Sequence, residues 1–99
     1  MRYTFEWNPV KASENLRKHR LTFDRGAEVF LDPLAVSILD EEHSEHEERW
    51  VTLGRDRHGH LLVLVHTLAE ISADECRIRM ISARRPTKRE TRQYEETEP

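Results

Sequence analysis

Residues 61–68 have the sequence Leu-Leu-Val-Leu-Val-His-Thr-Leu, the longest uncharged apolar run in this chain of 99 residues. A run of this length and composition predicts a central β-strand, and it falls far short of the roughly 20 residues that a membrane span needs. The preceding residues, Asp56-Arg57-His58-Gly59-His60, predict a hairpin connection because glycine readily adopts a positive φ. The run is therefore expected to lie in the middle of a sheet, after an antiparallel neighbour.

Further strands are expected on both sides of this run. The segments Glu48–Arg55 and Cys76–Arg84 alternate between apolar and polar residues, as half-buried strands do. Leu34–Leu39 predicts a shorter strand, and residues 2–7 predict a first strand in which every second residue is aromatic. The polar residues 69–75 are expected to form a loop.

Two helices are expected after the first strand. Asn8 is a favourable N-cap and Pro9 suits the first helical position, so a helix should run from about Pro9 to His19. Thr22 can cap a second, short helix that Asp32-Pro33 would end. Three apolar residues at helical spacing would form its buried stripe: Phe23, Ala27 and Phe30.

A third helix is expected near the C-terminus. Pro86 breaks the last strand, and Thr87-Lys88-Arg89-Glu90 has the pattern of a capping box, in which Thr87 and Glu90 exchange hydrogen bonds. The order of elements, with strands mostly joined by hairpins, predicts an α+β fold. Its antiparallel sheet of four to five strands would pack against the N-terminal helices, with the third helix at the end of the chain.

Length and composition limit the classes of protein. The chain fits a single domain, residues 1–99, because a second core could not bury enough apolar surface to be stable. Its one cysteine, Cys76, excludes an internal disulfide and a Cys-rich zinc site, and it is expected to fill the core. Residues 1–7 carry an acid and aromatic residues where a signal peptide would need a cationic flank and an apolar stretch. We therefore expect a cytoplasmic protein without a membrane segment.

Charge is distributed unevenly along the chain. The net charge is −3, yet residues 77–92 hold seven bases and one acid, while acids gather in residues 40–48 and 95–98. Arginine pairs well with phosphate oxygens, so the junction between the last strand and the last helix is a candidate phosphate site. The alternative is a solvated basic face of a terminal helix. The bases are Arg77, Arg79, Arg84, Arg85, Lys88, Arg89 and Arg92.

The first helix has a polar side that can support acid–base chemistry. Lys11, Asn15, Lys18 and His19 lie on that side. A histidine can transfer protons at neutral pH, and a lysine can stabilise a phosphorane. The alternative is an ordinary polar helix face, because a cationic histidine is favoured near a helix C-terminus by the helix dipole.

Four residues of the two middle strands are further candidates. His66 shares a strand face with leucines, which favours a hydrogen-bonded core histidine over a catalytic one. Glu48 and Arg49 could form a base and a phosphate clamp, or only an exposed ion pair. Arg49 and Arg55 lie on one strand face and weakly suggest a groove.

The acidic segment 41–47 contains His43 and His46, which could attract a metal ion. A His-x-x-His pair without a rigid element is a weak metal signal, so a solvated loop or a contact for a basic partner is favoured. The chain has no Gly-rich phosphate loop, no Ser-His-Asp order and no metalloprotease helix. Those enzyme classes are set aside.

Several separated motifs occur in a fixed order between about residues 4 and 96. They are Phe5-Glu6-Trp7-Asn8-Pro9 with Lys11, Asn15 and Lys18-His19; Leu62-Val63-Leu64-Val65-His66-Thr67; and Ile81-Ser82-Ala83-Arg84-Arg85 before Arg92-Gln93-Tyr94-Glu95. Together they resemble the BrnT family of toxins. Asn8 stands where that family usually has Asp, and Arg20 where Gly is common. A glycine at a helix end usually takes a positive φ, so Arg20 raises the question of how the first helix ends.

The resemblance implies a RelE-like fold and metal-independent cleavage of RNA, without a cofactor, that inhibits translation. It also implies neutralisation by a BrnA-like antitoxin of the ribbon-helix-helix type, through which alone the complex would bind operator DNA.

On this basis we hypothesise that a ribose 2′-OH attacks the adjacent phosphate and leaves a cyclic phosphate and a 5′-OH. Lys11, Arg79 and Arg84 would hold the phosphate. Protons would be handled by His19, His66 or Glu48. Other contacts to RNA would come from Lys18, Arg49, Arg55, Arg85, Lys88, Arg89 and Tyr94. The alternative is a non-catalytic binding module that acts only as co-repressor with a DNA-binding partner, docked through the basic strand and helix.

Overall fold

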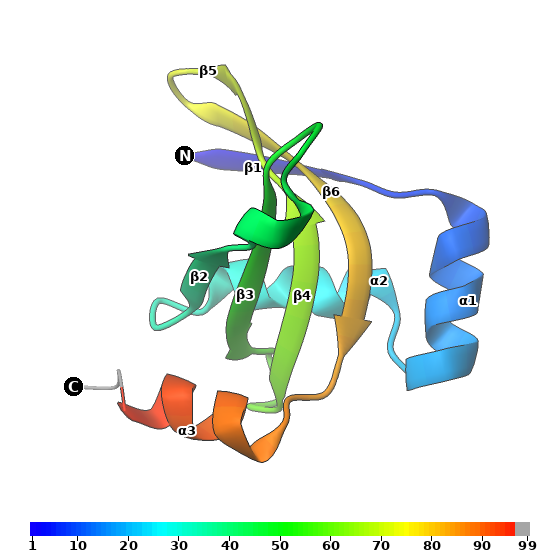
Figure 1. Cartoon of the computed structure of the whole chain (residues 1–99), viewed down its shortest axis with the longest axis vertical. Coiled ribbons are helices and arrows are strands. Elements are labelled where there is room, and N and C mark those ends of the chain that lie inside the picture. Colours follow the sequence, from blue (N-terminus) through cyan, green and yellow to red (C-terminus); the bar gives the residue numbers. More distant parts are fainter. Residues whose placement is uncertain (97–99) are drawn as a thin grey trace.

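A six-stranded mixed β-sheet organises residues 1–96, the part of the chain that this computed structural model describes (Figure 1). The strand order is β1-β6-β4-β3-β2, and β5 also pairs with β6. The strands are β1 (Arg2–Glu6), β2 (Val36–Leu39), β3 (Arg49–Arg55), β4 (Leu61–Thr67), β5 (Ala69–Ser72) and β6 (Glu75–Arg84). The helices are α1 (Pro9–His19), α2 (Phe23–Ala27) and α3 (Lys88–Glu96), with short 3-10 turns η1 (Glu28–Leu31) and η2 (Glu41–His43).

The predicted α+β class is confirmed, with two differences in the sheet. First, β1 runs parallel to β6, from the pair Arg2 and Glu75 to the pair Glu6 and Arg79, so the sheet is mixed and has six strands within residues 1–96. Second, residues 69–72 form β5 instead of a loop. All four residues of β5 are exposed, and only backbone pairing with β6 makes them a strand. Residues 69–72, Ala-Glu-Ile-Ser, alternate only weakly between apolar and polar, and the polar composition of the whole segment 69–75 favoured a loop.

Helices α1 and α2 cover one face of the sheet, which we call the inner face. In Figure 1, α2 crosses behind the middle strands, and α1 lies beyond β6. Gly26 brings α2 very close to the strands, because a Cβ there would lie 2.9 Å from Cδ2 of Leu64. The largest buried apolar cluster lies between these layers: Leu21, Phe23, Val29, Leu62, Leu64, Ile78, Met80 and Ala83.

Helix α3 packs against the opposite, outer face. Tyr94 forms a second buried cluster there with Leu53 and Val63. The predicted capping box is confirmed: Thr87 Oγ1 accepts from the Glu90 N–H at 3.2 Å, and Glu90 Oε1 accepts from the Thr87 N–H at 2.9 Å. Within residues 1–96 no helix has the length and apolar character to cross a membrane.

The register between β4 and β6 shifts at one position. Val65 pairs with Ser82, whereas the next residue, His66, pairs with Met80. Ile81 is therefore an extra residue in β6, which is the arrangement of a β-bulge. Bulges re-aim the side chains around them, and this one lies beside the candidate site described next.

Candidate functional site

A row of polar residues crosses the outer face of the sheet, from the start of β3 past the end of β4 to the middle of β6. Arg49 pairs with Thr67 across β3 and β4, and Met80 pairs with His66, so Arg79 lies at the level of Thr67 on β6. Neighbouring strands are about 4.8 Å apart, which puts the Cα atoms of Arg49 and Arg79 roughly 10 Å from each other. Two arginine residues thus flank one threonine in the sheet.

The same face continues down β6 towards α3. Ser82 lies level with Val65, and Arg84 lies opposite Val63, so Arg79 and Arg84 are two rows apart on one face. Two rows of an antiparallel sheet correspond to about 14 Å along the strand. The candidate phosphate-binding arginines are therefore on the same surface but are not adjacent.

Both arginines are paired with carboxylates. Arg79 forms an exposed ion pair with Glu47, in which 44% of the Arg79 side chain and 48% of the Glu47 side chain are accessible. Arg84 donates two bonds to Glu90, at 2.8 and 2.9 Å, in a more buried setting. The bonds from Arg84 and, to a smaller extent, from the Thr87 N–H together lower the pKa of Glu90 to about 2, against the opposing effect of burial. Arg84 therefore joins β6 to the start of α3.

A shallow depression of about 200 Å³ lies between α1 and the bulged part of β6. Four titratable side chains line it, Lys11, Glu14, Lys18 and His19, together with Asn15, Ile81 and Ser82. The polar side predicted for α1 thus faces β6.

Asn15 holds α1 against β6 through side-chain hydrogen bonds. Its side-chain amide accepts from the Ala83 N–H at 3.1 Å and donates to the Ala83 carbonyl at 2.9 Å and to the Leu21 carbonyl at 3.0 Å. The pairing of β1 with β6 ends at Arg79, so Asn15 replaces a neighbouring strand at Ala83. The sequence placed Asn15 on a polar face, and no pattern signals this buried role.

His66 lies on the inner face and is fully buried. Its Nδ1 donates to the Thr67 carbonyl at 3.0 Å, because a carbonyl only accepts, so Nε2 accepts from the Thr52 hydroxyl at 2.6 Å. Ser37 bonds to the same hydroxyl at 2.8 Å. Burial lowers the pKa of His66, although the Thr67 carbonyl partly opposes this. This environment is that of a core histidine.

Tyr94 is also buried. Its hydroxyl donates to Oδ2 of Asp32 at 2.7 Å, and the Arg55 guanidinium lies 5.1 Å from the centre of its ring. Burial raises the pKa of Tyr94, and the bond to Asp32 raises it further. The Tyr94 ring is therefore not exposed for stacking on a base, and the Arg55 guanidinium contacts this ring.

The remaining candidates lie on the surface around these residues. Glu48 is exposed and directly precedes β3 and Arg49. Arg85, Lys88 and Arg89 are exposed at the junction of β6 and α3. They extend the basic surface beyond Arg84.

The sequence matches the family described as "Ribonuclease toxin, BrnT, of type II toxin-antitoxin system" over residues 7–90. The chain belongs to the BrnT family. Its fold is similar to that of the Brucella abortus ribonuclease toxin BrnT, known from a crystal structure at 1.1 Å resolution. The TM-score is 0.60 at 18% identity, and the alignment covers 89% of this chain and 100% of that chain. No curated protein matches the sequence.

Membership of the BrnT family confirms the resemblance and makes the chain a ribonuclease toxin of a type II system, for which an antitoxin partner is implied. Within this BrnT-family chain, the structure brings Lys11, Lys18 and His19 together along β6. It places Arg49 and Arg79 on the outer face and buries His66.

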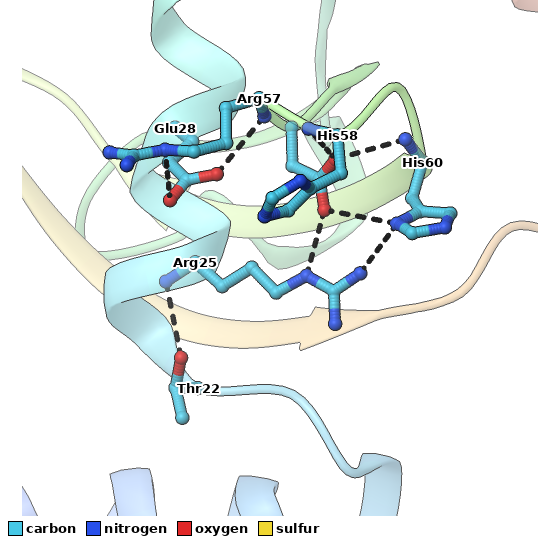
Figure 2. Close-up of polar contacts among 7 residues, drawn as sticks. Thr22, Arg25, Glu28, Arg57, His58 and His60 are labelled. Atoms are coloured by element: carbon cyan, nitrogen blue, oxygen red, sulfur yellow. Dashed lines mark hydrogen bonds and ion pairs between the residues drawn. The ribbon is translucent and has the colours of Figure 1, made fainter.

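This BrnT-family chain has a second polar cluster that the sequence did not predict, at the hairpin between β3 and β4. Figure 2 shows Arg25 of α2 reaching the imidazole of His60, at 2.8 Å between Nη2 and Nδ1. Arg25 also donates to the buried carboxylate of Asp56 at 2.7 Å. Burial alone would raise the pKa of Asp56, but bonds from Arg25 and from the N–H groups of His60 and His58 lower it to about 2. Asp56 therefore closes the hairpin.

The acidic segment of this BrnT-family chain folds back on itself. His43 bonds to Asp40 at 2.9 Å, and Ser44 Oγ donates to the Asp40 carbonyl at 2.5 Å. Among residues 1–96, no three potential metal ligands come together. The segment ends beside the outer face, where Glu47 meets Arg79.

Proposed function

We propose that this chain is an endoribonuclease that cleaves RNA without a metal ion, acts in the cytoplasm and inhibits translation. The observation that carries the proposal is the set of cationic groups around residues 79–84 of β6. Arg79 and Arg84 project from the outer face of this stretch. Lys11, Lys18 and His19 line the depression along its edge at Ser82. A phosphodiester at Ser82 would be within reach of positive charge from both sides.

In the proposed reaction the ribose 2′-OH attacks the adjacent phosphorus. A base takes the 2′-OH proton, the bond between O2′ and phosphorus forms, and the bond between phosphorus and O5′ breaks as O5′ receives a proton. The products are a 2′,3′-cyclic phosphate and a 5′-OH. The charge that develops on phosphorus would be stabilised by Lys11 and Arg79, with Arg84 fixing the junction to α3.

We assign proton transfer to His19, which is part-exposed in the depression beside Lys11 and Lys18. Glu48, which is exposed directly before β3, is the second candidate. His66 and Tyr94 are left out of the proposed site because both are buried in hydrogen-bonded settings. Lys18, Arg49, Arg85, Lys88 and Arg89 would contact the RNA backbone.

The test is cleavage of a single-stranded RNA oligonucleotide by the purified chain, in the presence of a chelator, with the products examined for a cyclic phosphate. Loss of an acid–base catalyst typically costs a factor of about 10²–10⁴ in rate, so His19→Ala should fall in that range. His58→Ala, an exposed histidine of the hairpin between β3 and β4 that does not line the depression, is the matched control and should retain activity. Retained activity in His19→Ala would remove this residue from the mechanism.

The partner is proposed to be a BrnA-like antitoxin of the ribbon-helix-helix type that brings the complex to operator DNA. Expression of the chain alone should arrest growth and degrade RNA, and co-expression of the antitoxin should relieve both effects. A chain that does neither when expressed alone would instead be a binding module that acts as co-repressor.

A further inference from the structure

We propose that Glu47 sets the affinity of the site for RNA by competing with the substrate phosphate for Arg79. The inference rests on the proposed function, because it assumes that Arg79 binds a phosphate of the RNA. Glu47 would be a competing anion that the substrate phosphate must displace. The starting observation is that Glu47 forms an ion pair with the guanidinium of Arg79.

The segment before β3 is built to hold Glu47 over the outer face. The Asp40 N–H donates to the Arg49 carbonyl at 2.8 Å, and the Arg49 N–H donates to Ser44 Oγ at 3.1 Å. These bonds anchor the segment at the start of β3. Figure 1 shows it in front of the upper ends of β3 and β4. From there Glu47 reaches across the level of Thr67 to Arg79 on β6.

The contact differs in kind from the one that Arg84 makes. Glu90 is held by two bonds from Arg84 and a third from the Thr87 N–H, and its side chain is only 20% accessible. For Glu47, the structure records one ion pair within residues 1–96, with a partner on a different strand. Glu90 is thus fixed as part of the helix cap, whereas Glu47 can leave without breaking any other recorded bond.

Exchange of the carboxylate for a phosphate is favourable for chemical reasons. A phosphodiester of RNA arrives with other phosphates that bind neighbouring cations, whereas Glu47 binds Arg79 alone. An exposed ion pair is weak, so the competition should reduce RNA affinity by up to about fivefold. Glu47 therefore lowers affinity without closing the site.

The experiment compares Glu47→Gln with Glu45→Gln, which removes the same charge from an exposed position in the same segment. Binding is measured by fluorescence anisotropy with a labelled 2′-O-methyl oligonucleotide, which has no free 2′-OH and cannot be cleaved. KM is measured separately with cleavable RNA. We expect Glu47→Gln to lower Kd and KM about two- to fivefold more than Glu45→Gln does.

The same pair of substitutions is then made in an Arg79→Ala chain. If Glu47 acts through Arg79, Glu47→Gln should have no larger effect there than Glu45→Gln. An equal gain from both substitutions in the unmodified chain would overturn the proposal in favour of a general charge effect, and a loss of affinity in Glu47→Gln would overturn it as well. If Arg79→Ala does not weaken binding, the RNA site itself is wrongly placed. If Arg79→Ala weakens binding but Glu47→Gln equals its control, only the role of Glu47 fails.

Discussion

Asn15 shows how one side chain can replace a strand. The pairing of β6 with β1 ends at Arg79. Further along β6, the side-chain amide of Asn15 forms hydrogen bonds with both the N–H and the carbonyl of Ala83. Backbone groups in a buried setting must find partners, and here one residue of a helix supplies them. The catalytic stretch that we propose on β6 therefore depends on a residue that would not itself touch RNA.

Asn15→Ala should destabilise the fold by about 2–4 kcal/mol, because it leaves the Ala83 backbone and the Leu21 carbonyl without a buried partner. The measurement is urea unfolding followed by circular dichroism, analysed for the midpoint and the slope. Ser13→Ala, an exposed change on the same helix, should stay within about 0.5 kcal/mol. If Asn15→Ala lowered the free energy of unfolding by no more than about 0.5 kcal/mol, water would be satisfying the backbone groups of Ala83 and Leu21 in the variant.

Arg20 answers the question of how the first helix ends. It has φ 60° and ψ 30°, and its N–H donates to the Leu16 carbonyl at 2.9 Å, so a non-glycine residue occupies the left-handed C-cap position. Arg20→Gly should raise the free energy of unfolding by about 0.5–1 kcal/mol, because glycine has no Cβ to oppose this conformation. Thermal unfolding shows directly whether Arg20→Gly raises or lowers the stability of the fold. Arg17→Gly, inside the same helix, should lower stability by about 1 kcal/mol, so the two variants should shift Tm in opposite directions.

Among the elements, α3 is attached to the sheet by a small number of specific contacts. Tyr94 supplies the apolar contact with Leu53 and Val63, and polar contacts come from the pair of Arg84 and Glu90 and from the Tyr94 hydroxyl. The rest of α3 is strongly polar and mostly exposed. Its docking should therefore respond to protonation of Glu90.

The pKa of Glu90 is about 2 in the folded chain and near 4.5 without the contacts of the fold. Because the folded value is the lower one, the stabilisation is complete above pH 4.5 and is lost as the pH falls towards 2. The difference in unfolding free energy between the unmodified chain and Glu90→Gln should be about 2–3 kcal/mol at pH 6 and should shrink towards zero near pH 2. The stabilisation that Asp56 provides is lost over the same pH range, but it is lost equally in both chains, so it does not contribute to this difference. A difference that is constant from pH 6 to pH 2 would contradict the assignment.

Elements with a periodic pattern or a capping signal could be predicted from the sequence, and those without such a signal could not. The helix at Pro9–His19, the capping box at Thr87 and the apolar strand β4 follow from local rules and are present. β5 was missed because its residues are all exposed. The parallel direction of β1 was missed because alternation gives the face of a strand and not its partner or direction.

For the candidate site, the sequence predicted the residue types but not their arrangement. The charge count placed seven bases in residues 77–92. It could not show that two of these bases are paired with carboxylates, Arg84 with Glu90 and Arg79 with Glu47, which lies 32 residues away in the chain. Likewise, Tyr94 had the chemistry of a site residue, and only packing shows that it is buried, whereas the leucines on the strand face of His66 already favoured a core position for that histidine. Pairing across the sheet is a long-range property that spacing along the chain does not contain.

At the scale of the whole molecule, a net charge of −3 coexists with a local cationic surface. Binding of RNA to such a surface depends on a few phosphate contacts and on the release of their counterions. With about three contacts to a single strand, log K should fall with log salt concentration at a slope of about −2, and Arg79→Ala should reduce the slope by about 0.7. Anisotropy titrations at several salt concentrations provide the measurement. An unchanged slope in Arg79→Ala would exclude a direct phosphate contact by that residue.

The parallel pairing of β1 with β6 also has a consequence for the time course of folding. The side chains of Arg2 and Glu75, which bond at 2.6 Å, lie 73 residues apart in the chain, so β1 is synthesised long before β6, its neighbour in the sheet. Contacts between such distant residues slow folding and leave apolar side chains uncovered in the meantime. Until β6 has emerged, Phe5 and Trp7 have no complete core to join. A nascent chain of this toxin should therefore remain without its finished sheet until most of it has been synthesised.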